Sequence, residues 1–310
     1  GIYYPPGSLK ARLCVAGNRS LAAFCEAHDV PFRRTGKWLL ALEKGEEERL
    51  AEIVATGREN GVPLEEVPLA RFRKEEPHVR ATAAVLSPST GILDVHGLFR
   101  ALRAIAEENG AAFAFRHELR GATAMPGGFE LLFVDPGGEE VRLSAPRVVN
   151  AAGLDADLVA GMPGLDVEAA GYRQTWTKGS YFRIRSSRRH LARRLLYPVM
   201  PHGYGSVLGI HLTIDLDGEL KLGPDVEPLA ERLADYAVDE SRRGAFLAAA
   251  RRYLPALVED DLSPDQSGIR ARLQAIAAPF RDFVVAEESA RGLPGWVNLV
   301  GIESPGLTCC

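Results

Sequence analysis

Hydrophobic residues recur at helical spacing in several stretches of the chain, which predicts amphipathic helices. After Ser8, the residues Leu9, Leu13, Leu21, Phe24 and Cys25 share one helical face, and Ser8 is the expected N-cap. The same spacing predicts helices over 46–60 and 94–110, each of which stops at a glycine. Two further helices are expected over 228–238 and 242–253.

Other stretches are continuous apolar runs or alternate with a period of two, and these predict strands. The first lies at 37–42, and 147–153 reads as a buried strand that ends in small residues. Asp135-Pro136-Gly137-Gly138 between 129–134 and 141–143 predicts a hairpin. Further strands are expected at 180–184, 207–214, 219–222 and 296–300.

The order of these elements predicts the fold class. Helices and strands alternate in the first half, and strands dominate after Thr177. The strand at Trp296 again resembles the buried strands of the first half. This is the profile of an α/β unit interrupted by a mainly antiparallel α+β unit.

Composition narrows the class of protein. The 310 residues are 46% hydrophobic and 25% charged, with a net charge of −4 and a pI near 6.0, which argues against a nucleic-acid partner. No apolar run is long enough to span a bilayer. The four cysteines show neither disulfide nor zinc spacing, so we expect no metal and a reducing compartment, namely the cytoplasm, with the protein either free or peripheral to a membrane.

The strand at 296–300 runs into a dense turn, Gly301 to Thr308, which is rich in glycine, serine and proline. A buried strand that feeds such a turn is where α/β proteins place backbone amides against a ligand. The chain starts at Gly1 rather than at a methionine and stops two residues after this turn, so we expect both ends to be internal to a longer protein.

Eight short motifs occur in one order along nearly the whole chain. Together they resemble the FAD-dependent L-2-hydroxyglutarate dehydrogenases, a branch of the D-amino-acid-oxidase-like flavoproteins. The motifs are Gly1-Ile2-Tyr3-Tyr4-Pro5, Ser8-Leu9-Lys10-Ala11, Ser87-Pro88-Ser89-Thr90-Gly91-Ile92-Leu93-Asp94, Asn150-Ala151-Ala152-Gly153-Leu154, Lys178-Gly179-Ser180-Tyr181-Phe182, Tyr197-Pro198-Val199, Gly209-Ile210-His211-Leu212-Thr213 and Leu222-Gly223-Pro224-Asp225.

The resemblance implies FAD as cofactor and a division into two intertwined halves. The FAD-binding half, a doubly wound sheet, is expected at 1–33, 92–165 and 282–310, and the α+β substrate half at 34–91 and 166–281. The implied cofactor-binding residues are Glu118, Leu119, Ala151, Ala152, Gly153, Gly301, Ile302, Ser304, Pro305, Gly306, Leu307 and Thr308. Small side chains at 151–153 admit a ligand closely, although a tightly packed strand would show them too.

Oxidation of a 2-hydroxy acid requires a cation for the carboxylate and a base for the hydroxyl proton. Arg270 is the best candidate cation, since a guanidinium binds a carboxylate with two hydrogen bonds. A Gly-x-Arg holds the substrate carboxylate in related oxidases, which usually continue with proline where this chain has Ala271. The alternative is a surface arginine that is ion-paired to Asp261 or Asp265.

His211 is the candidate general base, because a neutral imidazole near its ordinary pKa of about 6.5 accepts a proton readily. A satisfied core histidine on an apolar strand is the alternative. Lys178 and Tyr197 are candidate substrate-binding residues, which would contact a second carboxylate or keep the pocket dry. Each could equally lie at a domain boundary.

Three functions stay open at the level of the sequence. The first is oxidation of an L-2-hydroxy acid such as 2-hydroxyglutarate to the 2-oxo acid, with oxygen, a quinone or an electron-transfer protein as electron acceptor. The second is an amine or amino-acid oxidase of the glycine or sarcosine type. The third is a truncated, flavin-free remnant without catalytic activity.

The 310 residues contain no Gly-x-Gly-x-x-Gly turn between a strand and a helix, which is the turn that cradles FAD in the family. The glycine cluster at 203–209 leads into a predicted strand, so a hairpin turn is expected there. We therefore predict that the purified 310-residue polypeptide binds far less than one FAD per chain, because a phosphate site relies on this turn and its helix dipole. Absorbance near the flavin maximum measures this, and a yellow, stoichiometric flavoprotein would contradict it.

Overall fold

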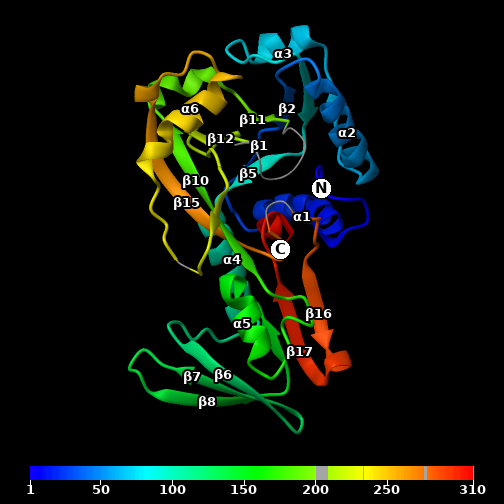
Figure 1. The fold of residues 1–310 in the computed structure, drawn as a ribbon, viewed down its shortest axis with the longest axis vertical. Coiled ribbons are helices and arrows are strands. Elements are labelled where there is room, and N and C mark those ends of the chain that lie inside the picture. Colours follow the sequence, from blue (N-terminus) through cyan, green and yellow to red (C-terminus); the bar gives the residue numbers. More distant parts are fainter. Residues whose placement is uncertain (200–208, 233, 276–277, 310) are drawn as a thin grey trace.

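A computed structural model describes residues 1–199, 209–232, 234–275 and 278–309. The molecule is elongated: a large sheet with its helices forms one end, a small sheet forms the other, and α1 (Leu9–Ala27) crosses the middle beside the end of the chain (Figure 1). The expected turn at 203–209 lies, except for Gly209, outside the described residues, as does the start of the strand expected at 207.

A nine-stranded mixed sheet is the largest unit. Its strand order is β14-β10-β13-β12-β11-β2-β4-β3, with β15 on the other side of β10, and the pair β11–β2 is parallel. The strands are β2 (Lys37–Ala41), β3 (Glu65–Glu66), β4 (Ala83–Ser87), β10 (Thr175–Ile184), β11 (Leu195–Pro198), β12 (Leu212–Ile214), β13 (Leu220–Leu222), β14 (Glu227–Leu229) and β15 (Leu262–Arg272).

The two faces of this sheet have different partners. On one face Trp38 and Leu40 are fully buried in the main core, which Phe246 of α6 (Arg243–Arg251) joins. On the other face Leu39 packs with Ile53 of α2 (Glu46–Glu59). Because side chains alternate along a strand, Lys37 lies on the same face as Leu39.

A second sheet contains β16 (Val284–Glu288), β17 (Leu293–Val300) and β9 (Val148–Asn150). β17 and β9 are parallel, as expected, with Asn298 opposite Asn150. The Asn150 amide donates to Asn298 Oδ1 at 2.8 Å, and Asn298 donates to Glu288 Oε1 at 2.9 Å. These buried hydrogen bonds satisfy polar groups that would otherwise destabilise the core.

The expected hairpin forms part of the small sheet at the far end, made of β6 (Glu118–Met125), β7 (Gly128–Val134) and β8 (Glu140–Ala145). Asp135 Oδ1 accepts from the amides of Gly137 and Glu139 and so closes the turn. A fourth, two-stranded sheet pairs β1 (Phe32–Arg34) with β5 (Gly91–Leu93).

The N-terminus of α1 has two side-chain caps. Ser8 Oγ accepts from Ala11 N at 3.2 Å, as predicted, and the Asp282 carboxylate accepts from the amides of Leu9 and Lys10. The helices α2 and α4 (Val95–Glu108) also match the predicted ranges. The remaining helices are α3 (Leu69–Glu75), α5 (Ala156–Gly161), η1 (Gly153–Asp155), η2 (Ser186–Leu191), η3 (Glu240–Arg242), η4 (Glu259–Asp261), η5 (Ser289–Arg291) and η6 (Gly306–Cys309).

Two predictions of secondary structure are wrong. The helix expected at 228–238 is replaced by β14, which pairs with β10, and by a segment whose described residues, 230–232 and 234–238, lie in no helix or strand. Lys178 holds this segment through Asp235, so tertiary contacts override its helical pattern. The strand expected over 147–153 ends at Asn150, and Val149 is 61% exposed rather than buried.

Glu76 is buried against the main core and accepts from Arg193 N at 2.9 Å. Burial raises its pKa from 4.5 to about 7. The folded state therefore binds a proton that the unfolded state has released between these pH values, so stability falls as pH rises across this window. We predict a loss of about 3 kcal/mol in the free energy of unfolding between about pH 4.5 and above pH 7.

Urea unfolding at a series of pH values measures this loss. Glu76→Gln should remove it, whereas the matched exposed variant Glu59→Gln should keep it. An identical pH dependence in Glu76→Gln and in the parent would show that Glu76 ionises freely.

Candidate active site

Tyr197 and His211 form the centre of the candidate site. Tyr197 lies on β11 opposite Leu39, and His211 lies directly before β12. Their rings stack with centroids 3.8 Å apart and planes 11° apart. Both side chains are partly exposed, so the site is reachable.

The backbone around His211 is fixed on both sides. Its carbonyl accepts from Gly223 N at 2.9 Å, and the buried Tyr253 hydroxyl donates to the carbonyl of Ile210 at 3.0 Å. A Cβ on Gly223 would lie 2.7 Å from Ser180 O, and its φ of 140° also favours glycine. Gly223 of the Leu222-to-Asp225 motif thus allows the backbone that is hydrogen-bonded to His211 to pass close to β10.

Asp225 completes this support. Its buried carboxylate accepts from Ser180 N at 2.7 Å and pairs with Arg242 at 2.7 Å. Ser180 and Asp225, which belong to two of the eight sequence motifs, therefore hold β10 against the segment that follows β13.

Arg270 reaches the same sheet face from β15. It pairs with Thr177, so its side chain shares a face with Thr177 and Tyr181. Within the described ranges Arg270 makes no ion pair, and the alternative partners have other cations: Asp261 pairs with Arg188, and Asp265 pairs with Arg183 and Lys221. The expected surface ion pair of Arg270 is therefore absent from the described part of the chain.

The electrostatics of the site differ from the sequence-based expectation for His211. Burial, reinforced by the charges of Lys37 and Arg270, lowers the pKa of His211 from 6.5 to about 3. Burial also raises the pKa values of Tyr197 and Tyr181. At neutral pH the imidazole is therefore uncharged and both phenols keep their protons.

Lys178 is not brought together with these residues. It pairs with Ile269 on β15, one position from Arg270, and so points to the opposite face of the sheet. There its ammonium lies 3.1 Å from Asp235 Oδ2. Its expected contact with substrate stays a prediction that this geometry does not favour.

The candidate cofactor edge lies where β9 and β17 end. Parallel strands present their carboxyl ends at one edge, which is the usual ligand crevice of α/β sheets. Ala151, Ala152 and Gly153 are exposed there, and Gly153 has open space around its Cα. These small, accessible residues fit a flat cofactor that approaches the backbone.

Gln174 joins the two segments of this edge. Its amide donates to Gly153 O at 3.1 Å, and its Oε1 accepts from Gly301 N at 3.0 Å. The loop that follows contains Ile302, Ser304 and Pro305, and it leads into η6, which contains Gly306, Leu307 and Thr308. Glu118 and Leu119 instead begin β6 in the small sheet at the far end (Figure 1).

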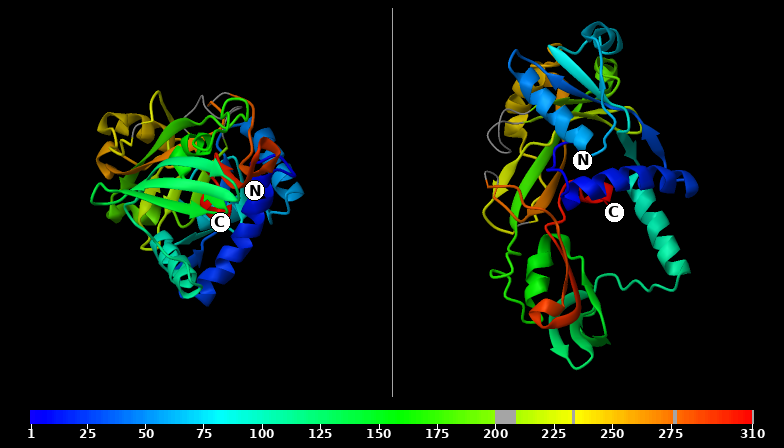
Figure 2. Two further views of the ribbon diagram at one scale, coloured as in Figure 1. Left: turned by 90° about the horizontal axis from the view of Figure 1, so that it is seen from below. Right: turned by 90° about the vertical axis from the view of Figure 1, so that its right-hand side faces the viewer.

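The loop after β17 also contacts the substrate side. Glu303 pairs with Lys10 at 3.1 Å and with Arg272 at 3.6 Å, and Arg272 lies two residues along β15 from Arg270 on the same face. A Cβ on Gly17 would lie 1.8 Å from Thr308 O, so only glycine lets α1 pack on η6. Both views in Figure 2 show η6 against α1.

Sequence reasoning missed three residues of the site: Lys37, Tyr181 and Gln174. Lys37 Nζ lies 4.4 Å from the centroid of the Tyr197 ring. Its position at the start of an otherwise apolar strand was an available signal, since a lysine next to a buried run is unusual. Gln174 carried no signal, because only the fold brings Gly153 and Gly301 together.

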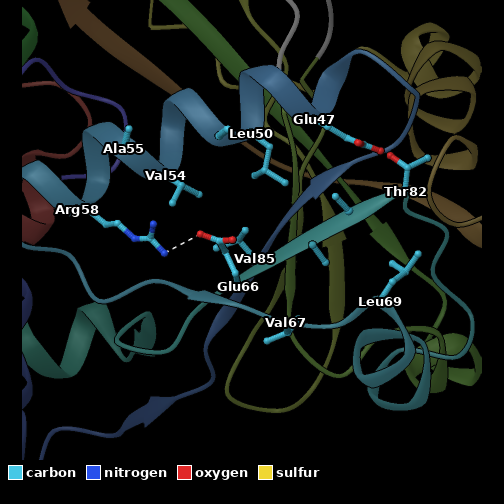
Figure 3. A pocket seen from close by; sticks show the side chains of 13 residues that line it. Glu47, Leu50, Val54, Ala55, Arg58, Glu66, Val67, Leu69, Thr82 and Val85 are labelled. Carbon is cyan, nitrogen blue, oxygen red and sulfur yellow. Dashed lines mark hydrogen bonds and ion pairs between the residues drawn. The ribbon is translucent and has the colours of Figure 1, made fainter.

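A groove of about 430 Å³ lies elsewhere, between α2 and the strands β3 and β4. Leu50 and Val54 of α2 face Val85 across it, and the ion pair between Arg58 and Glu66 spans it at 2.8 Å (Figure 3). None of the predicted site residues lines this groove.

Comparisons with known proteins show which proteins the chain is similar to. The family model described as FAD dependent oxidoreductase (DAO) matches residues 1–310. L-alpha-glycerophosphate oxidase from Mycoplasma pneumoniae, solved with FAD bound, superposes with a TM-score of 0.84 at 19% identity, covering 99% of this chain and 78% of that one. Glycine oxidase from Bacillus cereus superposes with a TM-score of 0.76 at 19% identity over 100% of this chain and 78% of that one.

Fold and family model together define an FAD-dependent oxidoreductase, and FAD is its cofactor. The mitochondrial L-2-hydroxyglutarate dehydrogenase of Arabidopsis thaliana is 33% identical over 99% of this chain and 70% of its own length. The Escherichia coli K12 enzyme of that name is 27% identical over 88% of this chain and 70% of its own. The chain belongs to the L-2-hydroxyglutarate dehydrogenase family of FAD-dependent oxidoreductases. In its described residues, no helix is long and apolar enough to cross a membrane.

Proposed function

We propose that this protein oxidises an L-2-hydroxy acid, with a 2-hydroxyglutarate-like compound foremost, to the 2-oxo acid. The observation that carries the proposal is the juxtaposition of a neutral imidazole with a guanidinium that has no carboxylate partner in the described part of the chain. Uncompensated cations in a partly buried site attract an anionic ligand. The names of the relatives support the hydroxy-acid class.

The positions of Arg270 and His211 suit one role each in this reaction. Arg270 binds the α-carboxylate and orients the α-carbon. His211 accepts the hydroxyl proton at a ring nitrogen, and its stacking on Tyr197 fixes the plane of the imidazole. The edge at 151–153 and the loop at 301–308 would hold FAD, which would supply the acceptor for the hydride that leaves the α-carbon.

The low pKa of His211 is compatible with this role because it belongs to the protein without substrate. A bound carboxylate neutralises part of the positive charge of Arg270, which removes one cause of the lowered pKa. This acts on the smallest of the three causes only, since burial, the largest, remains when substrate is bound.

The first test removes the cation. Arg270→Ala, in a flavin-loaded form of the protein that also contains the Gly-x-Gly-x-x-Gly turn, should lower kcat/KM for L-2-hydroxyglutarate about a hundredfold, because a charged hydrogen bond in a closed site is lost. The matched control is Arg183→Ala on the adjacent strand, whose guanidinium already pairs with Asp265 at 2.8 Å. Equal kcat/KM values for Arg270→Ala and the parent would disprove the clamp, and faster flavin reduction by glycine or sarcosine would favour an amine oxidase.

The second test removes the base. His211→Ala should lower kcat by about a hundredfold or more and leave flavin content unchanged, whereas exposed His117→Ala should change neither. In the parent, kcat/KM should show no acid limb near pH 6.5, because the pKa of His211 in the free protein is about 3. A limb near pH 6.5 that disappears in His211→Ala would show that the free imidazole titrates normally.

A further inference from the structure

Lys37 is a second cation of the site, and the opposing charge described near it is the thiolate of Cys14, whose pKa is lowered to about 5. Its Nζ lies 4.4 Å from the Tyr197 ring centroid and 5.7 Å from that of Tyr3. No ion pair or hydrogen bond to its ammonium occurs among residues 1–199, 209–232, 234–275 and 278–309. A partly buried ammonium that lies against aromatic rings, with a thiolate but no carboxylate near it, can still bind an anionic ligand.

The neighbouring cations on the same sheet are different. Lys178 pairs with Asp235, Lys221 with Asp265 and Arg272 with Glu303. Only Lys37 and Arg270, of the cations named on this sheet, lack such a partner in the described residues. This contrast indicates that the carboxylate partners of Lys37 and Arg270 come from a ligand.

Lys37 and Arg270 approach the site from different strands. Lys37 starts β2 next to β11, and Arg270 comes from β15 beside β10, with His211 between them in the strand order. The charges of both act on His211 and lower its pKa. A ligand whose reacting carbon lies at His211 therefore has one cation at each end.

We propose that Lys37 binds the distal carboxylate of the substrate and so selects dicarboxylic over monocarboxylic 2-hydroxy acids. The inference rests on the proposed function, in which Arg270 binds the α-carboxylate. The Tyr197 ring supports the lysine on one side and the imidazole by stacking, so it sets the separation between the distal carboxylate site and the base.

The test measures binding of two unreactive probes, glutarate and butyrate, by calorimetry to the same flavin-loaded form that contains the Gly-x-Gly-x-x-Gly turn. Lys37→Met should weaken glutarate binding by about 30-fold and change butyrate binding by less than about twofold, since only glutarate has a second carboxylate. The matched control is Lys44→Met, an exposed lysine that follows the same strand. Arg270→Ala should weaken both probes.

The outcomes separate the two proposals. If Arg270→Ala weakens both probes and Lys37→Met weakens neither, or both equally, the role of Lys37 is overturned and the proposed function stands. If Arg270→Ala leaves both probes unchanged, the proposed function itself fails. Lys37→Arg keeps a cation and should retain most of the preference for glutarate, which covers the case in which Lys37→Met does not fold.

The pH dependence gives a readout that a structural role would not change. Burial lowers the pKa of Lys37 to about 8, so glutarate binding should weaken above pH 8 in the parent and persist in Lys37→Arg. The other titratable groups that face Lys37 are Tyr3, Tyr197, His211 and Cys14 of α1. An unchanged alkaline loss in Lys37→Arg would assign it to one of these groups and overturn the proposal.

Discussion

The register of the nine-stranded sheet is the constraint on which the site depends. Trp38 is completely buried in the main core, so β2 has one possible register against β4 and β11. This register places Lys37 on the opposite face, and the register of β15 against β10 places Arg270 with Thr177. A slip of one residue would move Lys37 into the core, at a large cost in free energy.

Charged groups that are removed from water are paired differently inside and outside the site. Three buried carboxylates outside the site have cationic partners: Asp225 pairs with Arg242, Asp157 with Arg232 and Glu288 with Arg291. The site has the opposite arrangement, with cations beside aromatic rings and a neutral histidine. Such a site is destabilised when empty and is stabilised by an anionic ligand.

Contacts between distant segments connect this site to the cofactor edge. Gln174 joins Gly153 to Gly301, and Glu303 reaches both Lys10 and Arg272. The strands of 34–91 and 166–281 share one sheet, while β9, β16 and β17 form another. The division into a substrate half and an FAD-binding half stays a prediction that this arrangement supports.

The sequence by itself determined the local elements and the family. Ser8 and the glycines at 61 and 110 mark helix ends, Asp135 to Gly138 closes a hairpin, and eight motifs indicate the flavoprotein family, because these signals act within a few residues or recur in order. Only the tertiary structure decided that Lys178 points away from the site, that Lys37 lies in it and that 228–238 is not helical. Strand register and long-range pairing determine which face a side chain occupies and which charges remain uncompensated, and neither can be deduced from spacing along the chain.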